Sequence, residues 1–335
     1  MTEKMHILPN DNFRHVVLIA FDGAQVLDIT GPAAVFAAAN DELPRPAYRL
    51  TIASPGGGNV MTSSHVGIAT ERLTGIDGPV DTLLIAGGSD EGLRTLIRDR
   101  EAQAWVGGKI ATARRYGSVC GGVFALAAWG LIDGRRVATH WRDVDDLART
   151  YPALAVDAQA LYVEDGPLWT SAGITTGIDM SLALIERDLG SAVATNVARR
   201  LVLYARRPGH QSQFSPLLDA QAAGDYADLI DWIGGNLAAD LDVEALAARA
   251  GQSVRSFHRR FTAATGKTPA AFVEARRLEH ARNLLGAGAP MKRVAAESGF
   301  RSPERLTRAF SRVFGVSPST WRAVHTGGGP QARAV

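Results

Sequence analysis

The sequence predicts an α/β domain with a mostly parallel sheet sandwiched between helices, followed by a smaller all-α domain. Two observations lead to this fold class, and the distribution of charge separately distinguishes the two parts of the chain and favours nucleic-acid binding by the second. Short apolar runs alternate with helical stretches from residue 15 to about residue 206. Beyond residue 225 only helical patterns occur, and one of them is repeated. The charge divides similarly: residues 1–250 hold 21 Lys and Arg against 30 Asp and Glu, whereas residues 251–325 hold 14 against 4.

The first part of the chain alternates predicted strands and helices. The strands are nearly continuous in apolar residues, as is typical of a parallel sheet that is buried on both faces. We expect strands at 15–21, 48–54, 81–87, 116–120, 135–140 and 167–173. We expect helices at 100–114, 121–130, 142–149 and 177–189, and a further helix that contains Gly31-Pro32.

A change in composition marks the expected domain boundary. Residues 206–217, RRPGHQSQFSPL, contain two prolines, a glycine and several polar residues, which favours a linker. We therefore predict a first domain at 14–205, a linker at 206–224 and a second domain at 225–325. The glycine-rich end of the chain, 326–335, is predicted to be a disordered tail.

The second domain contains an internal repeat, in which residues 246–272 align with residues 294–321. Each copy has a short Ala-rich helix, a glycine, a serine and a second helix rich in arginine. Gly251 and Gly299 would supply the left-handed residue that a tight turn between helices needs. Ser253 and Ser302 are predicted to cap the second helix of each copy. The repeat thus predicts two helix-turn-helix motifs.

This repeat resembles the AraC-type DNA-binding domain, most closely in AAESGFRSPERLTRAFSRVFGVSPSTWR (295–322). Leu306 stands where that family often has an aromatic residue. The resemblance implies that both second helices enter the major groove of double-stranded DNA and that a helix at about 270–286 sets their spacing. Arginine can bind guanine with two hydrogen bonds and glutamate can accept from cytosine, although each arginine could instead contact phosphate. The residues expected at the DNA are Ser253, Arg255, His258, Arg259, Ser302, Glu304, Arg305 and Arg308.

Three turns of the first domain carry its candidate site. Asp28 follows the first strand, the third strand ends in Gly87-Gly88, and Cys120 ends the fourth strand with two glycines directly after it. A cysteine between a strand and a helix has the geometry of a nucleophile elbow, although the full signature is missing. A nearby helix N-terminus would favour the thiolate form of Cys120, whereas the effect of Asp28 on the thiol depends on whether Asp28 is ionised.

These segments, together with GLIDGRRVATHW (130–141) and WTSAGITTGIDMSLALIE (169–186), resemble the DJ-1/PfpI superfamily over residues 14–205. With the linker and the repeat, nearly the whole chain is similar to the GlxA family of AraC-type regulators. The resemblance implies a ligand pocket formed by Asp28, Gly88, Cys120, Gly121 and His140. Peptidase-like members have a histidine base directly after the cysteine, where this chain has Gly121. Isonitrile hydratase-like members tend to have a hydroxyl residue there.

The hypothesis that follows is a transcriptional regulator, in this family more often an activator. Its first domain would bind a small effector, which the resemblance suggests to be nitrogen-containing, and would form a homodimer. Two alternatives remain open at this stage. The elbow could serve a hydratase, glyoxalase or amidase type of enzyme, or Cys120 could be a redox sensor that forms a sulfenic or sulfinic acid or a bond to another chain.

Composition excludes several other classes of protein. One cysteine cannot form an internal disulfide or a multi-cysteine zinc site, and the N-terminus lacks the apolar region of a signal peptide. The longest apolar stretch is too short to span a membrane. We therefore expect a cytoplasmic protein with no membrane association, no metal, no cofactor and no catalytic residues. Asp143, Asp145 and Asp146 are interpreted as a solvated first helical turn rather than as a cation site.

Overall fold

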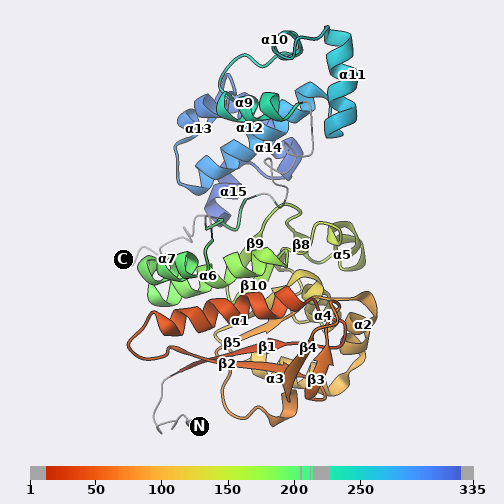
Figure 1. Ribbon diagram of the computed structural model, residues 1–335, viewed down its shortest axis with the longest axis vertical. Coiled ribbons are helices and arrows are strands. Elements are labelled where there is room, and N and C mark those ends of the chain that lie inside the picture. The colour runs from red at the N-terminus through yellow and green to blue at the C-terminus, as the bar shows by residue number, and fades with distance from the viewer. Residues whose placement is uncertain (1–12, 204–205, 212, 214–225, 326–335) are drawn as a thin grey trace, which may run out of the picture. The chain divides into compact units, whose positions relative to one another are not determined.

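A computed structural model describes residues 13–203, 206–211, 213 and 226–325 (Figure 1). The chain divides into two compact units, Met1–Gly209 and His210–Val335. The predicted tail and most of the predicted linker lie outside the described residues. Within the described residues, no helix combines the length and the apolar character that crossing a bilayer requires.

The first unit is built on an eight-stranded sheet of order β3-β4-β2-β1-β5-β6-β10-β9. Its strands are β1 Arg14–Ile19, β2 Tyr48–Ser54, β3 Gly58–Met61, β4 Gly67–Arg72, β5 Thr82–Ile85, β6 Arg115–Val119, β9 Tyr162–Asp165 and β10 Leu168–Ser171. The neighbours from β4 to β10 pair in parallel, and only β3 and β9 are antiparallel to their partners. The predicted mostly parallel sheet is confirmed.

Helices cover both faces of this sheet. They are α1 Val26–Asp41, α2 Asp90–Arg98, α3 Arg100–Ile110, α4 Val123–Ala128, α5 Val144–Thr150, α6 Thr175–Leu189 and α7 Ser191–Arg200. Alternate residues of β1 enter different cores: Val17 and Ile19 pack in one, Val16 and Leu18 in the other. Helices α1, α6 and α7 cover the second core together (Figure 1).

Some strands differ from the sequence prediction. Residues 135–140 do not form a strand of the main sheet; only β7 Arg136–Val137 is extended, and it pairs with β8 Ala155–Val156 in a separate sheet. Beyond β7, the backbone N–H of Ala138 donates to the side-chain hydroxyl of Thr170 in β10 and not to a backbone carbonyl of that strand. The hairpin of β3 and β4 and the edge strand β9 were not predicted, because most residues of the hairpin are exposed and show no apolar alternation.

Residues 206–209 belong to the first unit. Arg207 donates to the buried carboxylate of Asp179 from its backbone N–H and its guanidinium group. The carbonyl of Gly209 accepts from the backbone N–H of Leu161 at 2.7 Å. The next residue, His210, belongs to the second unit, where its carbonyl accepts from the buried Arg282 and its ring packs on Trp321. Each unit therefore holds its own end of the connecting segment.

The second unit contains only helices within its described residues. They are α9 Ala227–Gly235, α10 Val243–Arg249, α11 Val254–Thr265, α12 Pro269–Gly286, α13 Met291–Glu297, α14 Pro303–Phe314 and α15 Pro318–His325. Helices α10 and α11 pack on one apolar core with the start of α12, and α13 to α15 pack on another with its end. Figure 1 shows α12 running between the two motifs. The predicted all-α unit with two helix-turn-helix motifs is confirmed.

Both turns use the predicted residues. Gly251 and Gly299 have φ values of +64° and +71°, in the left-handed region that favours glycine. The Ser253 hydroxyl accepts from the backbone N–H of Ser256, and the Ser302 hydroxyl accepts from that of Arg305, both at 3.3 Å. These serines therefore cap α11 and α14, as local sequence signals predict.

Candidate functional site

Cys120 occupies a strained turn directly after β6. Its φ of +56° is unusual for a residue with a side chain, and it begins the short 3-10 turn Cys120–Gly122 that leads into α4. Two glycines make room for it. A Cβ atom at Gly173 would lie 2.2 Å from the Cys120 Cβ, and one at Gly87 would lie 2.7 Å from the same atom. The surrounding backbone is therefore shaped around this side chain.

Asp28 lies in the first turn of α1, against the thiol. Its carboxylate accepts from the backbone N–H of Ile174 at 2.6 Å and from that of Gly87 at 3.1 Å. It also lies beside the Cys120 thiol, and the two groups shift each other's pKa. The turns after β5, β6 and β10 are thus joined by one carboxyl group, which is only 2% exposed. Ile174 has a φ of +53°, which places a second strained residue at this site.

The electrostatics of this pair oppose thiolate formation. Burial raises the pKa of the Cys120 thiol, and the charges of Asp28 and then Asp143 raise it further, against the N–H of Gly121. Burial also raises the pKa of Asp28, to about 6, although the two backbone N–H groups lower it. At neutral pH the thiol is therefore protonated beside a largely ionised carboxylate. The Gly121 N–H at the start of the helical turn favours the thiolate, as the sequence predicts, but burial and Asp28 outweigh it.

The other residues predicted for the pocket differ in their distance from the thiol. Gly121 adjoins it, and Gly88 forms a bridge with Ala24 beside the Gly87 turn. His140 lies after β7, and its Nδ1 accepts from the backbone N–H of Arg142 at 3.4 Å. Burial lowers the pKa of His140, and Arg142 adds to this effect against Asp143. Among the described residues, no hydrogen bond joins His140 to Cys120 or Asp28.

Position 121 has room for a side chain. A Cβ atom there would meet the Leu93 side chain at 3.7 Å and the Asp143 carboxylate at 3.9 Å, both ordinary contact distances. Packing therefore does not explain why this chain lacks a base next to Cys120. Asp143 faces this position, and sequence reasoning assigned it only to a solvated turn. The approach of Asp143 to position 121 depends on how the loop after β7 folds, and no local sequence pattern indicates this.

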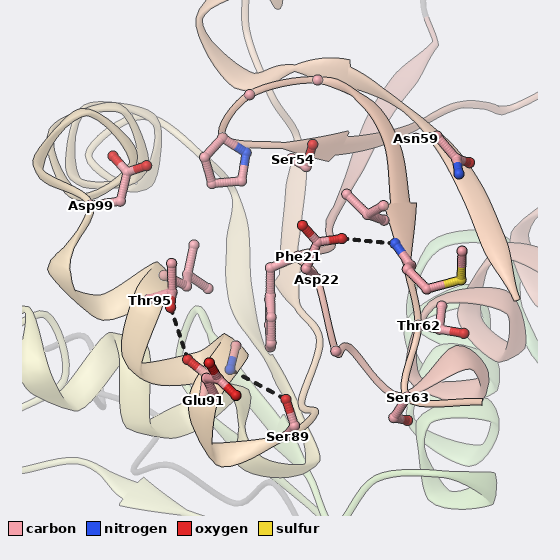
Figure 2. A pocket seen from close by; sticks show the side chains of 18 of the residues that line it. Phe21, Asp22, Ser54, Asn59, Thr62, Ser63, Ser89, Glu91, Thr95 and Asp99 are labelled. Carbon is pink, nitrogen blue, oxygen red and sulfur yellow. Dashed lines mark hydrogen bonds between the residues drawn. The ribbon is translucent and has the colours of Figure 1, made fainter. Parts of the chain in front are cut away.

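A separate pocket of about 780 Å³ lies over the carboxyl ends of β1 and β2 (Figure 2). Its lining includes Phe21, Asp22, Ser54 and Glu91, but none of the five residues that the sequence assigned to a ligand pocket. Across the parts of the chain that the structure describes, no three His, Cys, Asp or Glu side chains are grouped so that they could hold a metal ion.

In the second unit, the predicted DNA-facing residues lie on the exposed faces of α11 and α14. Phe257 and Phe261 are buried, and at about 100° per residue Arg255 and Arg259 lie on the opposite side of α11. Similarly, Leu306 and Phe310 are buried, so Glu304 and Arg308 lie on the outer side of α14. His258 and Arg305 are exposed on the flanks of their helices.

The arginines on these helices differ in whether they have a partner. No ion pair within the described residues holds Arg255, Arg259 or Arg308, so their charges are available to a nucleic acid. Arg312, further along α14, pairs with Glu274 at 2.6 Å. Arg260 is a further exposed cation on α11 that sequence reasoning did not assign, although its position on the helix could have indicated it.

Comparison with known proteins matches each unit to a family. Residues 14–187 match the DJ-1/PfpI family model, and residues 246–323 match a helix-turn-helix domain model. The HTH-type transcriptional regulator CdhR of Pseudomonas aeruginosa is 31% identical over 83% of this chain and 82% of its own length. The chain belongs to the HTH-type transcriptional regulators that carry a DJ-1/PfpI domain. The regulator has the architecture that the sequence predicted.

Other relatives share all or part of this regulator. The HTH-type transcriptional regulator GlxA of Rhizobium meliloti is 28% identical over 85% of the chain and 88% of its own length. Isonitrile hydratase of Pseudomonas putida is 33% identical over 58% of the chain and 80% of its own length. A solved THiJ/PfpI family protein from Pseudomonas syringae superposes with a TM-score of 0.53 at 23% identity, covering 70% of the regulator and 92% of that structure. This last similarity shows the fold alone.

Proposed function

We propose that this regulator recognises a specific DNA sequence through α11 and α14 and that its first unit senses a small metabolite. The observation that carries the DNA-binding part is the pair of helices with unpaired arginines facing away from their cores. Arg255, Arg259 and Arg308 have the length and charge to contact guanine edges or phosphates. We assign the remaining predicted residues, including the two capping serines, to the same interface.

The sensing role is supported by the protonation state of the first unit's cysteine. A protonated, half-buried thiol beside an ionised carboxylate is a poor nucleophile, so Cys120 serves better as a pocket wall than as a catalyst. We propose that effector binding in the first unit changes DNA binding by the second, that the protein activates transcription, and that it acts as a homodimer in the cytoplasm.

Binding of the full chain to DNA tests the first part of this proposal. Labelled fragments from upstream of the gene for this protein and of its neighbours would be titrated with protein while fluorescence anisotropy is followed. We expect binding that weakens steeply with salt, because cations at phosphates release counterions. Arg255→Ala should lower affinity for the preferred fragment by about 1–3 kcal/mol. A protein that binds no upstream fragment at low salt would refute it.

A second function is favoured by the similarity to isonitrile hydratase over the first unit. Cys120 sits in an elbow with a carboxyl group beside it, which is an arrangement that a cysteine-dependent hydration could use. Full-length protein would be incubated with simple isonitriles and the formamide product measured. Turnover by the wild type that Cys120→Ala abolishes would support an enzyme, whereas equal rates in both would exclude it.

A further inference from the structure

In the second unit, a turn that belongs to the core of the first motif (α10 and α11) touches the second motif (α13 and α14). Helix α9 ends at Gly235, and in the turn that follows it the N–H of Ala239 donates to the carbonyl of Asn236 at 2.9 Å. The Leu237 side chain in this turn is buried in the core around α11. Its carbonyl oxygen lies against Gly299, where a Cβ atom would be only 1.9 Å away. Leu237 therefore contacts both motifs.

Arg277 holds this turn from the middle of α12, the helix that runs between the two motifs (Figure 1). Its Nε donates to the carbonyl of Leu237 at 3.0 Å, and its Nη2 donates to the carbonyl of Ala239 at 2.9 Å. A Cβ atom at Gly299 would lie 2.7 Å from the same Nε. The half-buried guanidinium group therefore lies at the place where the turn meets the second motif.

The partners of Arg277 distinguish it from the arginine beside it. Arg276 pairs with the carboxylate of Glu279 on the same helix at 3.3 Å. Within the part of the chain that the structure describes, Arg277 is in no ion pair, and it donates to backbone carbonyls instead. A planar guanidinium group presents its donors in a fixed geometry, so two carbonyls bound by one group are held in a single orientation. Arg277 therefore fixes the position of a turn and does not neutralise a neighbouring charge.

We propose that Arg277 is a positioning residue that sets the number of base pairs between the DNA segments bound by α11 and α14. Through Leu237 it fixes where the turn before α14 lies relative to the core that carries α11. One base pair advances B-DNA by about 3.4 Å and rotates it by about 35°, so a small change in the angle between the two helices changes the spacing that both can bind. This inference rests on the proposed DNA-binding function.

Selection of binding sites from random duplex DNA by the full-length protein tests the inference. Wild type should enrich two sequence blocks at one spacing, and insertion of one base pair between the blocks should weaken binding about tenfold or more. Arg277→Met keeps the aliphatic stem and removes the donors. It should enrich the same blocks at mixed spacings, and the insertion should weaken its binding less than about threefold. Arg276→Met is the matched control and should keep the wild-type spacing, because Arg276 pairs with Glu279 on its own helix.

A second measurement needs no DNA. Spin labels would be attached through Arg255→Cys and Arg308→Cys in a Cys120→Ser background, and the distance between the labels measured by pulsed electron paramagnetic resonance. We expect one narrow distribution with Arg277 present and with Arg276→Met, and a broader or shifted one with Arg277→Met. If Arg277→Met does not fold, Arg277→Lys replaces it in both experiments, because lysine keeps the charge but lacks the fork that binds two carbonyls.

The outcomes separate this inference from the proposed function. A folded Arg277→Met variant that keeps the wild-type spacing would overturn the positioning role, even if it bound more weakly, because a general loss of stability lowers affinity at every spacing alike. Identical distance distributions in the presence and absence of the Arg277 side chain would overturn it as well. Failure of wild type to enrich any sequence would count against the proposed function, and the label distances would still decide whether Arg277 orients the two motifs.

Discussion

Cys120 is surrounded by groups that keep its thiol protonated, and this property can be measured directly. The pKa of the thiol is raised first by burial and then by Asp28. The thiolate fraction, and with it the rate of alkylation by iodoacetamide, should therefore rise with a midpoint well above the ordinary thiol value of about 8.5. Asp28→Asn removes a negative charge and should lower this midpoint by about one pH unit.

Two comparisons secure the interpretation of the alkylation profile. The same protein in urea should titrate with an ordinary thiol midpoint, because burial is lost. Asp22→Asn, whose residue is not among those that shift the thiol pKa, should leave the folded profile unchanged. A folded midpoint at or below the ordinary value would contradict the assignment of Cys120 as an unreactive pocket wall.

The glycine opposite Cys120 provides a second prediction at the level of single residues. Gly173 and Gly190 have nearly the same φ, +88° and +86°, but only Gly173 has the thiol side chain where a Cβ would go. Gly190→Ala should cost about 1–3 kcal/mol of unfolding free energy for its backbone conformation alone, because φ 86° and ψ 166° lie in a region that essentially only glycine adopts. Gly173→Ala should cost about 3 kcal/mol or more, because the clash adds to that strain. Urea titrations that gave equal losses would contradict this reading of the elbow.

At the level of elements, the two helix-turn-helix motifs contain a natural control for each other. Gly251 and Gly299 occupy the same turn position, but a Cβ atom at Gly299 would lie 1.9 Å from the Leu237 carbonyl oxygen, and one at Gly251 would meet nothing within 4 Å. Gly251→Ala should therefore cost about 1 kcal/mol and Gly299→Ala about 3 kcal/mol or more. Hydrogen exchange should show a larger loss of amide protection in α13 and α14 of Gly299→Ala than in α10 and α11 of Gly251→Ala. Equal losses in the two variants would contradict the prediction.

The same motifs show why part of the fold could be predicted from the sequence. Their turns and caps depend on residues within a few positions of each other, such as Gly251 and Ser253, and two copies at a fixed offset reinforced the pattern. The hairpin of β3 and β4 lacked such a signal, because its side chains are mostly exposed. Helix α1 is covered by α6 and α7, so it shows little of the one-sided apolar pattern of a surface helix.

The candidate site was predictable in its residue types but not in its surroundings. Cys120 and its flanking glycines mark a strand–turn–helix junction in the sequence itself. The contact of Asp28 with Ile174 joins residues 146 positions apart along the chain. The closeness of Gly173 to the Cys120 thiol joins two further segments, and both contacts depend on tertiary packing. The sign of the thiol pKa shift depends on that packing too, because burial and Asp28 outweigh the local effect of the Gly121 N–H.

For the whole molecule, the two separate cores of the second unit predict how its DNA contacts combine. Arg259 lies on a helix packed in one core and Arg308 on a helix packed in the other. Changes at distant sites without shared partners usually add to within about 0.5 kcal/mol. The losses in DNA-binding free energy from Arg259→Ala and Arg308→Ala should therefore sum in the double variant, as measured by anisotropy at fixed salt.

Arg312→Ala is the internal comparison for that experiment, because Arg312 is on the same helix as Arg308 but is paired with Glu274. Its removal should change DNA affinity by less than about 0.5 kcal/mol, because Glu274 already offsets the charge of Arg312 and the exposed pair contributes little to stability. The double variant could instead lose no more DNA affinity than the single variant with the larger loss. The two motifs would then bind DNA as one coupled unit. The rigid connection through α12 would then transmit the loss of one contact to the other, and the two cores would not be independent.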